Sequence, residues 1–405
     1  MPDESDPVGV QSNSEVSQTR RLTEVFLLFL RLGLFSYGGP AVYIAMMRDE
    51  VVRRRRWLDD AHFLDLLGAT NLIPGPNATE MAIHLGRVRA GWRGIIPAGV
   101  CFIVPAMVIT LGFAWAYVEY GSTPEVSWLL YGVKPVIIGV VVQALWSLGR
   151  TAVRGWFMAV VGAAILALYL WGGVNEIGLL FGGALFVMVA RNLSRLAGLG
   201  AAGAGLLLPG LGAIKVALPL GASAAAATAS VSLAQLFLTF LKIGSILYGS
   251  GYVLLAFLRT DFVERLGWLT EEQLLDAVAV GQVTPGPVLS TATFIGYVLG
   301  SWEGALLATV GVFLPSFIFV AVTSPIVPHL RRWRWTGALL DGVNIAALAL
   351  MAGVTLQLGR AAIVDPLTGV LAVLGALLLV RFGLNSAWLV LLGGAVGFIY
   401  KGLTG

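Results

Sequence analysis

The chain has 405 residues, of which 58% are hydrophobic and 12% are charged, and its mean hydropathy is +0.86. Soluble domains carry about 25% charged residues, so this composition excludes a large soluble domain and indicates a membrane protein. The formal net charge of +4 includes an arginine run at Arg53 to Arg56. Because this run lies between apolar segments, it is typical of a cytoplasmic loop beside anionic lipid, and no nucleic-acid partner is expected.

Residues 1–21 lack both an apolar core of their own and the basic start and hydrophobic centre of a secretory signal, so we expect a disordered polar tail. Apolar segments follow one another after this tail, and a transmembrane helix needs roughly 20 such residues. We therefore expect a series of membrane-spanning helices. The first covers residues 23–47, and Gly38, Gly39 and Pro40 are expected to interrupt it. Four more are expected in the first half, at residues 94–117, 126–149, 155–172 and 177–190.

The stretch NLIPGPNATE, residues 71–80, places Pro-Gly-Pro between two apolar arms at residues 61–73 and 77–91. Proline inside a helix removes a backbone donor and clashes with the preceding turn, so the helix must break there. Each arm is too short to cross a bilayer and has arginines at its outer end, which predicts a re-entrant hairpin. Asn77 and Glu80 have the spacing of a capping box, so the second arm is expected to use Asn77 as its N-cap.

The second half of the chain repeats the first. FLRLGLFSYGG from Phe29 is similar to FLKIGSILYGS from Phe240, and a second Pro-Gly-Pro, in GQVTPGPVLS, follows the first by 285 − 74 = 211 residues. Further on, GVKPVIIGVVVQALWSLGR from Gly132 corresponds to GVNIAALALMAGVTLQLGR from Gly342, with an offset of 210. We expect a first transmembrane repeat at residues 22–195, a Gly/Ala-rich linker at 196–232 whose path is left open, and a second repeat at 233–405.

Loop charges change sign between the repeats. The loop at residues 48–60 is rich in arginine, whereas its counterpart from Arg259, RTDFVERLGWLTEE, is net acidic; conversely, the acidic loop EYGSTPE from Glu119 corresponds to HLRRWRW from His329. Because cytoplasmic loops collect Lys and Arg, the two repeats are expected to be inserted upside-down relative to each other. The predicted fold is an all-α polytopic membrane protein with two inverted-topology repeats, each of about five transmembrane helices plus one re-entrant hairpin.

Two helix breaks at equivalent places in inverted repeats predict a shared central cavity, because non-helical backbone at membrane depth survives only where protein buries it or a water-filled cavity receives it. A helix that starts there points its free N–H groups and positive dipole end into the cavity, which favours an anionic ligand. For Gly38 and Gly39, close helix packing is the alternative. The candidate substrate-binding residues at the breaks are Asn71, Pro74, Gly75, Pro76, Asn77, Ala78, Thr79, Gln282, Thr284, Pro285, Gly286, Pro287, Ser290, Gly38 and Gly39.

Charged residues within the apolar runs support a negative ligand. Arg31 and its counterpart Lys242 each cost at least about 2.5 kcal/mol in a bilayer, so both are expected to face the interior and to contact substrate; snorkelling, or pairing with acidic residues, is the alternative. Glu80 and the equivalent pair Asp65 and Asp276 are candidates for proton coupling, because a carboxyl group among apolar helices takes up a proton more readily than in water. For Glu80, a capping role is the alternative.

The three histidines, His62, His84 and His329, are scattered and Cys101 is the single cysteine, so neither a metal site nor an internal disulfide is expected. The nucleotide-binding pattern GxxxxGK[ST] does not occur. We therefore expect no cofactor and no enzymatic activity, and an ion gradient or the membrane potential as the energy source. A passive anion channel and a membrane-embedded enzyme are the rival classes.

The paired blocks FLRLGLFSYGGP with PGPNATEMAIHLG, and FLKIGSILYGSGYVLLAFL with TPGPVLSTATFIGYVLG, resemble the two halves of long-chain members of the chromate ion transporter family. The resemblance covers residues 22–401. In the second half Val288 and Thr291 stand where the first has Asn77 and Glu80, which departs from the family pattern and leaves no equivalent acid there.

The resemblance implies a multi-pass protein of the inner (plasma) membrane that exports chromate, using the proton-motive force, with sulfate as a structural mimic. Its expected partners are chromate or sulfate, protons and membrane lipid. Sulfate uptake is an alternative, and homodimerisation is left open.

Overall fold

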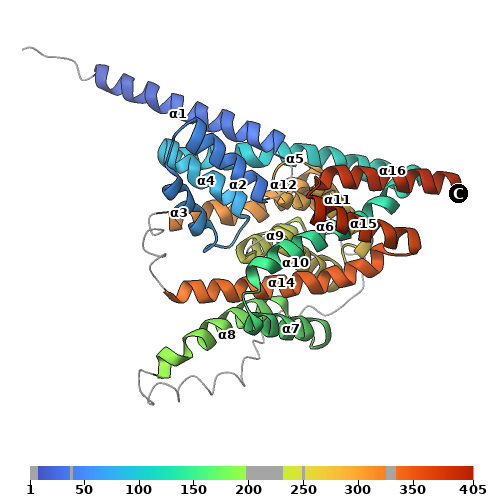
Figure 1. Ribbon diagram of the computed structural model, residues 1–405. Coiled ribbons are helices and arrows are strands. Elements are labelled where there is room, and N and C mark those ends of the chain that lie inside the picture. Colours follow the sequence, from blue (N-terminus) through green and yellow to red (C-terminus); the bar gives the residue numbers. More distant parts are fainter. Residues whose placement is uncertain (1–7, 37–39, 198–230, 249–250, 325–333, 405) are drawn as a thin grey trace, which may run out of the picture.

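The computed structural model describes residues 8–36, 40–197, 231–248, 251–324 and 334–404, and within these ranges the chain forms helices and turns without a β-strand (Figure 1). The predicted all-α fold is confirmed. The helices lie side by side in a bundle, which agrees with the membrane character of the composition.

The helices of the first repeat follow the order predicted from its apolar segments. They are α1 (Val8–Phe35), α2 (Pro40–Arg48), the π-helical η1 (Asp49–Arg54), α3 (Asp60–Thr70), α4 (Asn77–Ala90), the 3-10 turn η2 (Gly91–Gly94), α5 (Ile95–Tyr120), α6 (Pro124–Ala152), α7 (Trp156–Trp171) and α8 (Glu176–Ala197). The first apolar segment is split between α1 and α2, as expected. Gly38 and Gly39 themselves lie outside the described residues.

The second repeat has matching elements in the same order. They are α9 (Leu233–Ile246), η5 (Gly251–Val253), α10 (Leu254–Leu258), the π-helical η6 (Arg259–Arg265), α11 (Glu271–Val283), the 3-10 turn η7 (Val288–Ser290), α12 (Thr291–Thr323), α14 (Arg334–Ala362), α15 (Pro366–Phe382) and α16 (Ser386–Thr404). Helix α12 corresponds to α4 and α5 together, because Gly300 and Ser301 break its helical geometry internally.

The offset between the repeats changes within this region. Gly86 and Gly94 approach each other closely in the first repeat, and Gly296 and Gly304 do the same in the second, with 296 − 86 = 210. The change from 211 to 210 therefore lies between the Pro-Gly-Pro turn and Gly296, where the chain after the second turn begins with the 3-10 turn η7 instead of an α-helix.

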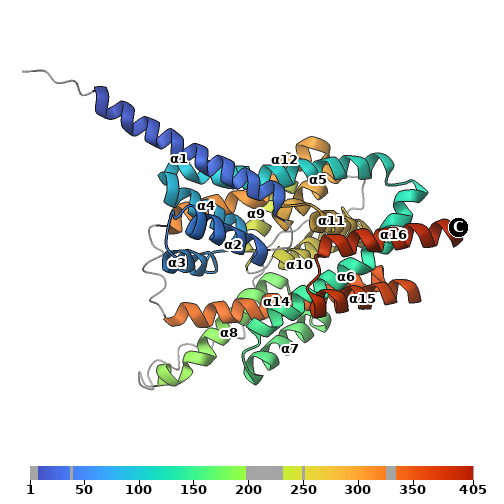
Figure 2. The same cartoon turned by 45° about the horizontal axis from the view of Figure 1, so that its top comes forward.

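Corresponding helices of the two repeats run in opposite directions. In Figure 1, α6 begins at the right of the molecule and α14 at the left, while α8 ends at the left and α16 at the right; Figure 2 shows the same directions. The repeats also interlock, because α6 packs against α15 and α16 of the second repeat, and α14 packs against α7 and α8 of the first. The predicted pair of inverted repeats is confirmed.

The expected disordered tail is wrong for residues 8–21, which belong to α1. No proline or glycine occurs between residues 10 and 32, so nothing stops the helix from extending beyond its apolar part. The Gln18 side chain also donates a hydrogen bond to the carbonyl oxygen of Ala90 (2.8 Å), which ties this extension to the end of α4. Residues 1–7, and most of the linker predicted at 196–232, lie outside the described ranges.

Five helical segments within the described ranges are long and apolar enough to cross a membrane, at residues 77–120, 124–152, 288–323, 337–362 and 386–404. Helices α7, α9 and α15 are apolar but shorter. Trp156 and Trp171, at the two ends of α7, are strongly exposed, as tryptophans at membrane interfaces usually are. A total of about ten crossings, and a re-entrant path for each hairpin, remain predictions.

Candidate functional site

Both Pro-Gly-Pro turns lie against the opposite repeat. The backbone N–H of Gly75 donates a hydrogen bond to the carbonyl oxygen of Leu247 (2.6 Å). The backbone N–H of Gly286 donates one to the carbonyl oxygen of Ser36 (3.1 Å). The two bonds are equivalent, because 286 − 75 and 247 − 36 both equal 211. Ser36 follows α1 and Leu247 follows α9, so each turn is held by the end of the first helix of the other repeat.

Glycine is required at the centre of each turn. The backbone φ is +140° at Gly75 and +89° at Gly286, a region that other residues rarely adopt. A Cβ atom at Gly75 would lie 2.1 Å from Glu80 Oε1 and 2.7 Å from Ser316 Oγ, and one at Gly286 would lie 2.8 Å from the Cβ atom of Ala106. Ser316 of α12 and Ala106 of α5 are equivalent positions, since 316 − 106 = 210. The first turn therefore packs against α12 in the same way as the second packs against α5.

The predicted capping box at Asn77 is wrong. Pro76 is the N-cap of α4, and its carbonyl oxygen accepts the backbone N–H groups of Thr79 (2.8 Å) and Glu80 (3.1 Å). Asn77 is therefore already helical, and its side-chain Nδ2 reaches back across the turn to Asn71 Oδ1 (2.6 Å). This side-chain bridge has no equivalent in the second turn, where Gln282 and Val288 occupy the two positions.

A buried polar cluster surrounds the first turn. Glu80 is 0% exposed, and neither of its carboxylate oxygens has a hydrogen-bond partner among the described residues. The hydroxyl groups of Thr79 and Ser316 are also buried and have no hydrogen-bond partner among the described residues. Burying polar groups without partners costs free energy, so the cluster is suited to a polar ligand, an ion or water.

Beside the second turn, the hydroxyl groups of Thr284, Ser290 and Thr291 have partners in the protein, whereas the buried hydroxyl group of Ser36 has none among the described residues. Thr284 Oγ1 lies 3.3 Å from both the carbonyl oxygen of Gly281 and Ser290 Oγ, and Thr291 donates to the carbonyl oxygen of Val288 (2.8 Å). The two turns therefore share a backbone geometry but differ in chemistry. Ala78, Pro74, Pro285, Pro287 and the buried Gln282 lie within or beside the turns.

Arg31 and Lys242 pair with acidic residues of the π-helical segments. Arg31 lies 3.9 Å from Glu50, and Lys242 Nζ lies 2.6 Å from Asp261, an equivalent pair since 261 − 50 = 211. The alternative of ion pairing is therefore observed, although with Glu50 and Asp261 rather than with Asp65 and Asp276.

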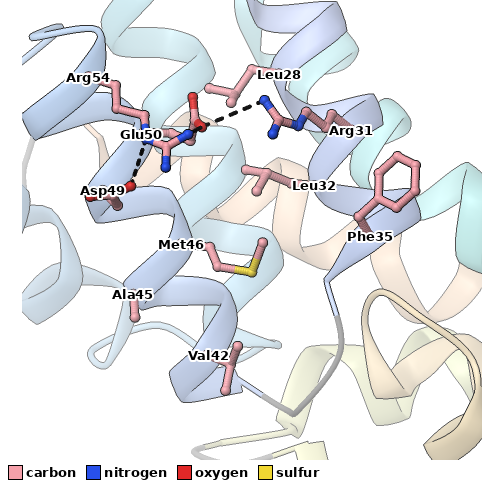
Figure 3. A pocket seen from close by; sticks show the side chains of 10 residues that line it. All are labelled: Leu28, Arg31, Leu32, Phe35, Val42, Ala45, Met46, Asp49, Glu50 and Arg54. Atoms are coloured by element: carbon pink, nitrogen blue, oxygen red, sulfur yellow. Dashed lines mark hydrogen bonds and ion pairs between the residues drawn. The ribbon is translucent and has the colours of Figure 1, made fainter.

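The expected inward orientation is wrong for Arg31, whose side chain is 63% exposed. Gly33, two residues on, packs closely against the backbone of α5, and residues two apart point to nearly opposite sides of a helix. Arg31 instead lines a cavity of about 860 Å³ between α1, α2 and η1, together with Phe35, Met46 and Glu50 (Figure 3).

Asp276 forms an ion pair between the repeats. Its carboxylate lies 3.4 Å from Lys134 Nζ of α6 and accepts a hydrogen bond from the Tyr117 hydroxyl of α5 (3.0 Å). The carboxylate is buried, whereas the equivalent Asp65 on α3 is half-buried. Within the described ranges, no group of three or more His, Cys, Asp or Glu side chains could hold a metal ion.

Sequence reasoning missed Ser36 and Ser316 as parts of the site. The available signal for Ser316 was its position after Pro315, which is equivalent to Pro105 in the repeat (315 − 105 = 210). Ser36 directly precedes the predicted break in the first apolar segment, but no pattern in its own neighbourhood indicates that its carbonyl oxygen holds the distant turn at Gly286.

The sequence matches the model of a protein family described as "Chromate transporter" twice, over residues 23–188 and 234–398. The chain is 30% identical over 383 residues to the "Chromate transport protein" of Cupriavidus metallidurans, covering 93% of this chain and 92% of the relative. It is 32% identical over 348 residues to that of Pseudomonas aeruginosa (83% and 81% covered), and 30% identical over 346 residues to the "Probable chromate transport protein" of Synechococcus elongatus (85% and 86%). No solved structure matches the chain.

Proposed function

Since the chain belongs to the chromate transporter family, we propose that this multi-pass membrane protein carries chromate across the membrane at the contact between its Pro-Gly-Pro turns and the opposite repeats. The direction is export, the energy source is the proton-motive force, and sulfate is a competing mimic. The paired turns support this assignment, because a site at the contact of inverted repeats is the plan on which many secondary transporters are built.

The crossed hydrogen bonds of Gly75 and Gly286 carry the proposal. Each turn is held by the end of the first helix of the opposite repeat, so a movement of one repeat against the other changes the geometry of both turns at once. Alternating access requires such a coupling between a central site and the relative position of the repeats.

The chemistry near the first turn suits a tetrahedral dianion. The beginning of α4 carries the positive end of its helix dipole, and the unpaired hydroxyl groups of Thr79 and Ser316 can donate to anionic oxygens. Asn77 closes the turn through Asn71. Chromate and sulfate have the same charge and a similar shape, so hydrogen bonds of this kind hold both.

Glu80 is the proposed proton carrier. It adjoins the first turn, and it is fully buried with neither carboxylate oxygen in a hydrogen bond among the described residues. A negative charge in such surroundings is costly, and a bound proton removes that cost. Because Glu80 Oε1 and Ser316 Oγ approach the same point at Gly75, the carboxyl group adjoins the proposed anion site, so that its protonation state and anion binding influence each other.

The experiment is chromate and sulfate uptake into inverted membrane vesicles, with and without an uncoupler. The wild type is expected to accumulate chromate and to lose accumulation with the uncoupler. Asn77→Ala and Ser316→Ala are expected to reduce uptake strongly at normal membrane levels. Thr355→Ala is the matched control, because that buried hydroxyl bonds the carbonyl oxygen of Met351 within its own helix (2.7 Å).

Arg31→Ala tests whether the cavity between α1, α2 and η1 contributes positive charge to substrate binding, and reduced uptake is expected. Unchanged uptake in Asn77→Ala, Ser316→Ala and Arg31→Ala together contradicts the proposed site. Uptake that follows the membrane potential without any effect of the proton gradient indicates a passive anion channel instead, and accumulation in right-side-out vesicles indicates uptake of sulfate or chromate.

A further inference from the structure

Buried polar atoms without partners gather on helix α4. Thr79 Oγ1, both oxygens of Glu80, His84 Nε2 and Arg87 Nη1 are all buried and have no hydrogen-bond partner among the described residues. Native proteins leave few buried polar atoms unpaired, and those that remain usually bind water or an ion. Four successive polar residues of a single helix with this property therefore need an explanation.

Three of these residues lie on one face of α4, because Glu80, His84 and Arg87 have the spacing i, i+4 and i+7. That face meets α12 of the second repeat. Ser316 of α12 approaches the same point as Glu80 at the Pro-Gly-Pro turn, and Ser324, at the end of α12, lies 3.1 Å from His84 Nδ1. Residues 316 and 324 are eight apart and so share a face of α12.

The resulting polar seam, defined by Glu80, His84, Arg87, Ser316 and Ser324, runs along the contact between the repeats. Glu80 is 0% and His84 2% exposed. The Cβ atoms of residues four apart on a helix are about 5–6 Å apart, so their side chains are neighbours, and one water with two hydrogen bonds of about 2.8 Å can link such a pair.

The seam is shielded from bulk solvent along its length and reaches an opening at one end. A small apolar cluster of Ile73, Ile83, Ile95 and Val320 borders it. At its far end, Arg87 lines a cavity of about 570 Å³ together with Arg21, Arg89 and Arg93. Arg87 also lies over the ring of Trp92, 4.1 Å from its centroid. Arginines in these loops place the opening at the cytoplasmic side.

The equivalent contact in the other half of the molecule has no such seam. Glu80 corresponds to Thr291 with the offset of 211 and to Ser290 with the offset of 210, and neither is an acid. With the offset of 210 that relates Gly86 to Gly296, Phe294 stands in place of His84, and Ala106 and Ala114 stand in place of Ser316 and Ser324. The seam is therefore specific to one side of the protein and does not follow from the repeat.

We propose that the polar seam is a proton path between the arginine-lined opening and Glu80, with His84 as its relay. This inference rests on the proposed function, in which Glu80 exchanges protons during chromate transport. His84 Nε2 accepts a proton from hydronium at the opening, which leaves water. The imidazolium then gives a proton to the water that bridges to Glu80, and that water passes a proton to the carboxylate. One bond to hydrogen breaks and one forms in each transfer, so His84 ends neutral and Glu80 ends protonated.

Two further groups interact electrostatically with the members of this path. Tyr248, which follows α9, interacts with Glu80, and Arg87 interacts with His84. Ser316 and Ser324 are the hydroxyl groups that α12 presents to the seam. The path is thus built from both repeats, and movement of α12 against α4 opens or closes it.

The test compares two readouts in proteoliposomes that contain a pH-sensitive dye. One is proton movement driven by a chromate gradient; the other is exchange of labelled chromate between equal concentrations, which needs no net proton movement. His84→Gln keeps a hydrogen-bonding side chain but cannot relay a proton at neutral pH. We expect it to slow proton movement by about a hundredfold while exchange stays within about twofold of the wild type. His62→Gln, at an exposed histidine of α3, is the matched control and should leave both readouts unchanged.

The other possible results distinguish a failure of the proton path from a failure of the proposed function. Wild-type proton movement in His84→Gln overturns the path and leaves the proposed function intact. Chromate exchange in the wild type without any proton movement overturns both the coupling and the path, and a wild type that moves no chromate overturns the proposed function. If His84→Gln does not fold, Ser324→Ala, which removes the hydroxyl group beside Nδ1, is measured with the same expected loss and the same contradicting result.

Discussion

Gly75 donates its backbone N–H to the carbonyl oxygen of Leu247, 172 residues further along the chain and in the other repeat. Gly286 repeats this bond towards Ser36. Neither Pro-Gly-Pro turn is therefore complete within its own repeat, and the two repeats form one functional unit.

The first prediction concerns these glycines. Gly75→Ala combines an unfavourable positive φ with a Cβ that would lie 2.1 Å from Glu80 Oε1, so we expect it to lower the stability of the detergent-solubilised protein by about 1–3 kcal/mol or more and to abolish transport. Gly91→Ala is the control, because its φ is also positive (+65°) but nothing lies within 4 Å of the added carbon. Equal losses in the two variants would show that tight packing at the turn is unimportant.

The second prediction concerns the ion pair between the repeats. Lys134→Ala leaves the buried carboxylate of Asp276 without its cation, and breaking a buried ion pair usually costs about 3–5 kcal/mol. The measurement is the unfolding midpoint in a denaturing detergent. Arg53→Ala removes an exposed pair with Asp49 (3.9 Å), for which at most about 1 kcal/mol is expected. A midpoint of Lys134→Ala equal to that of Arg53→Ala would argue against a structural role for the pair.

The third prediction is a pH dependence at the turn between α14 and α15. The backbone N–H of Thr368, followed by the Tyr131 hydroxyl, holds the pKa of Asp365 below its usual range. The ionised Asp365 carboxylate therefore stabilises the folded protein fully above the unfolded pKa of about 3.9. This stabilisation disappears as the pH falls through the lower folded pKa. Asp365→Asn should be less stable than the wild type at neutral pH and equal to it in strong acid. A difference that persists unchanged in acid contradicts the role of the charge.

The fourth prediction concerns the packing between α6 and α16. A Cβ at Gly132 would lie 1.9 Å from the carbonyl oxygen of Gly393, and one at Gly397 would lie 2.5 Å from the backbone nitrogen of Gly132. Gly132→Val should therefore force the repeats apart and reduce the amount of protein that elutes as a single species. Gly112→Val is the control, since nothing lies within 4 Å of that position. Normal elution of Gly132→Val would show that the two helices can separate freely.

Much of the architecture could be predicted because its signals are local. The apolar segments, the proline breaks and the sign of each loop charge can be identified from short stretches of sequence. The offset of about 211 residues then pairs each such stretch of the first repeat with its equivalent in the second. The start of α4 was predicted at the right residue but with the wrong cap. Pro76 already binds the N–H groups of Thr79 and Glu80 through its carbonyl oxygen, and sequence spacing could not distinguish this from a side-chain cap.

The candidate site was only partly predictable. The two turns and Glu80 were found because Pro-Gly-Pro and a carboxyl group among apolar residues stand out in any sequence. The partners of Arg31 and Lys242 were missed, because Glu50 and Asp261 lie in charged segments that resemble ordinary loops. Ser316 and Ser324 were missed as well, because serines in an apolar helix are common and only their neighbours give them a role.

The sequence by itself determined that this chain is a membrane protein of two inverted repeats, each with one broken helix, because hydrophobicity, proline chemistry and charge placement act within single segments. Only the tertiary structure decided that each turn is held by the opposite repeat and that Glu80 and His84 meet Ser316 and Ser324. Those contacts join residues more than 170 positions apart, and they depend on how the helices of the two repeats pack, which no local pattern encodes.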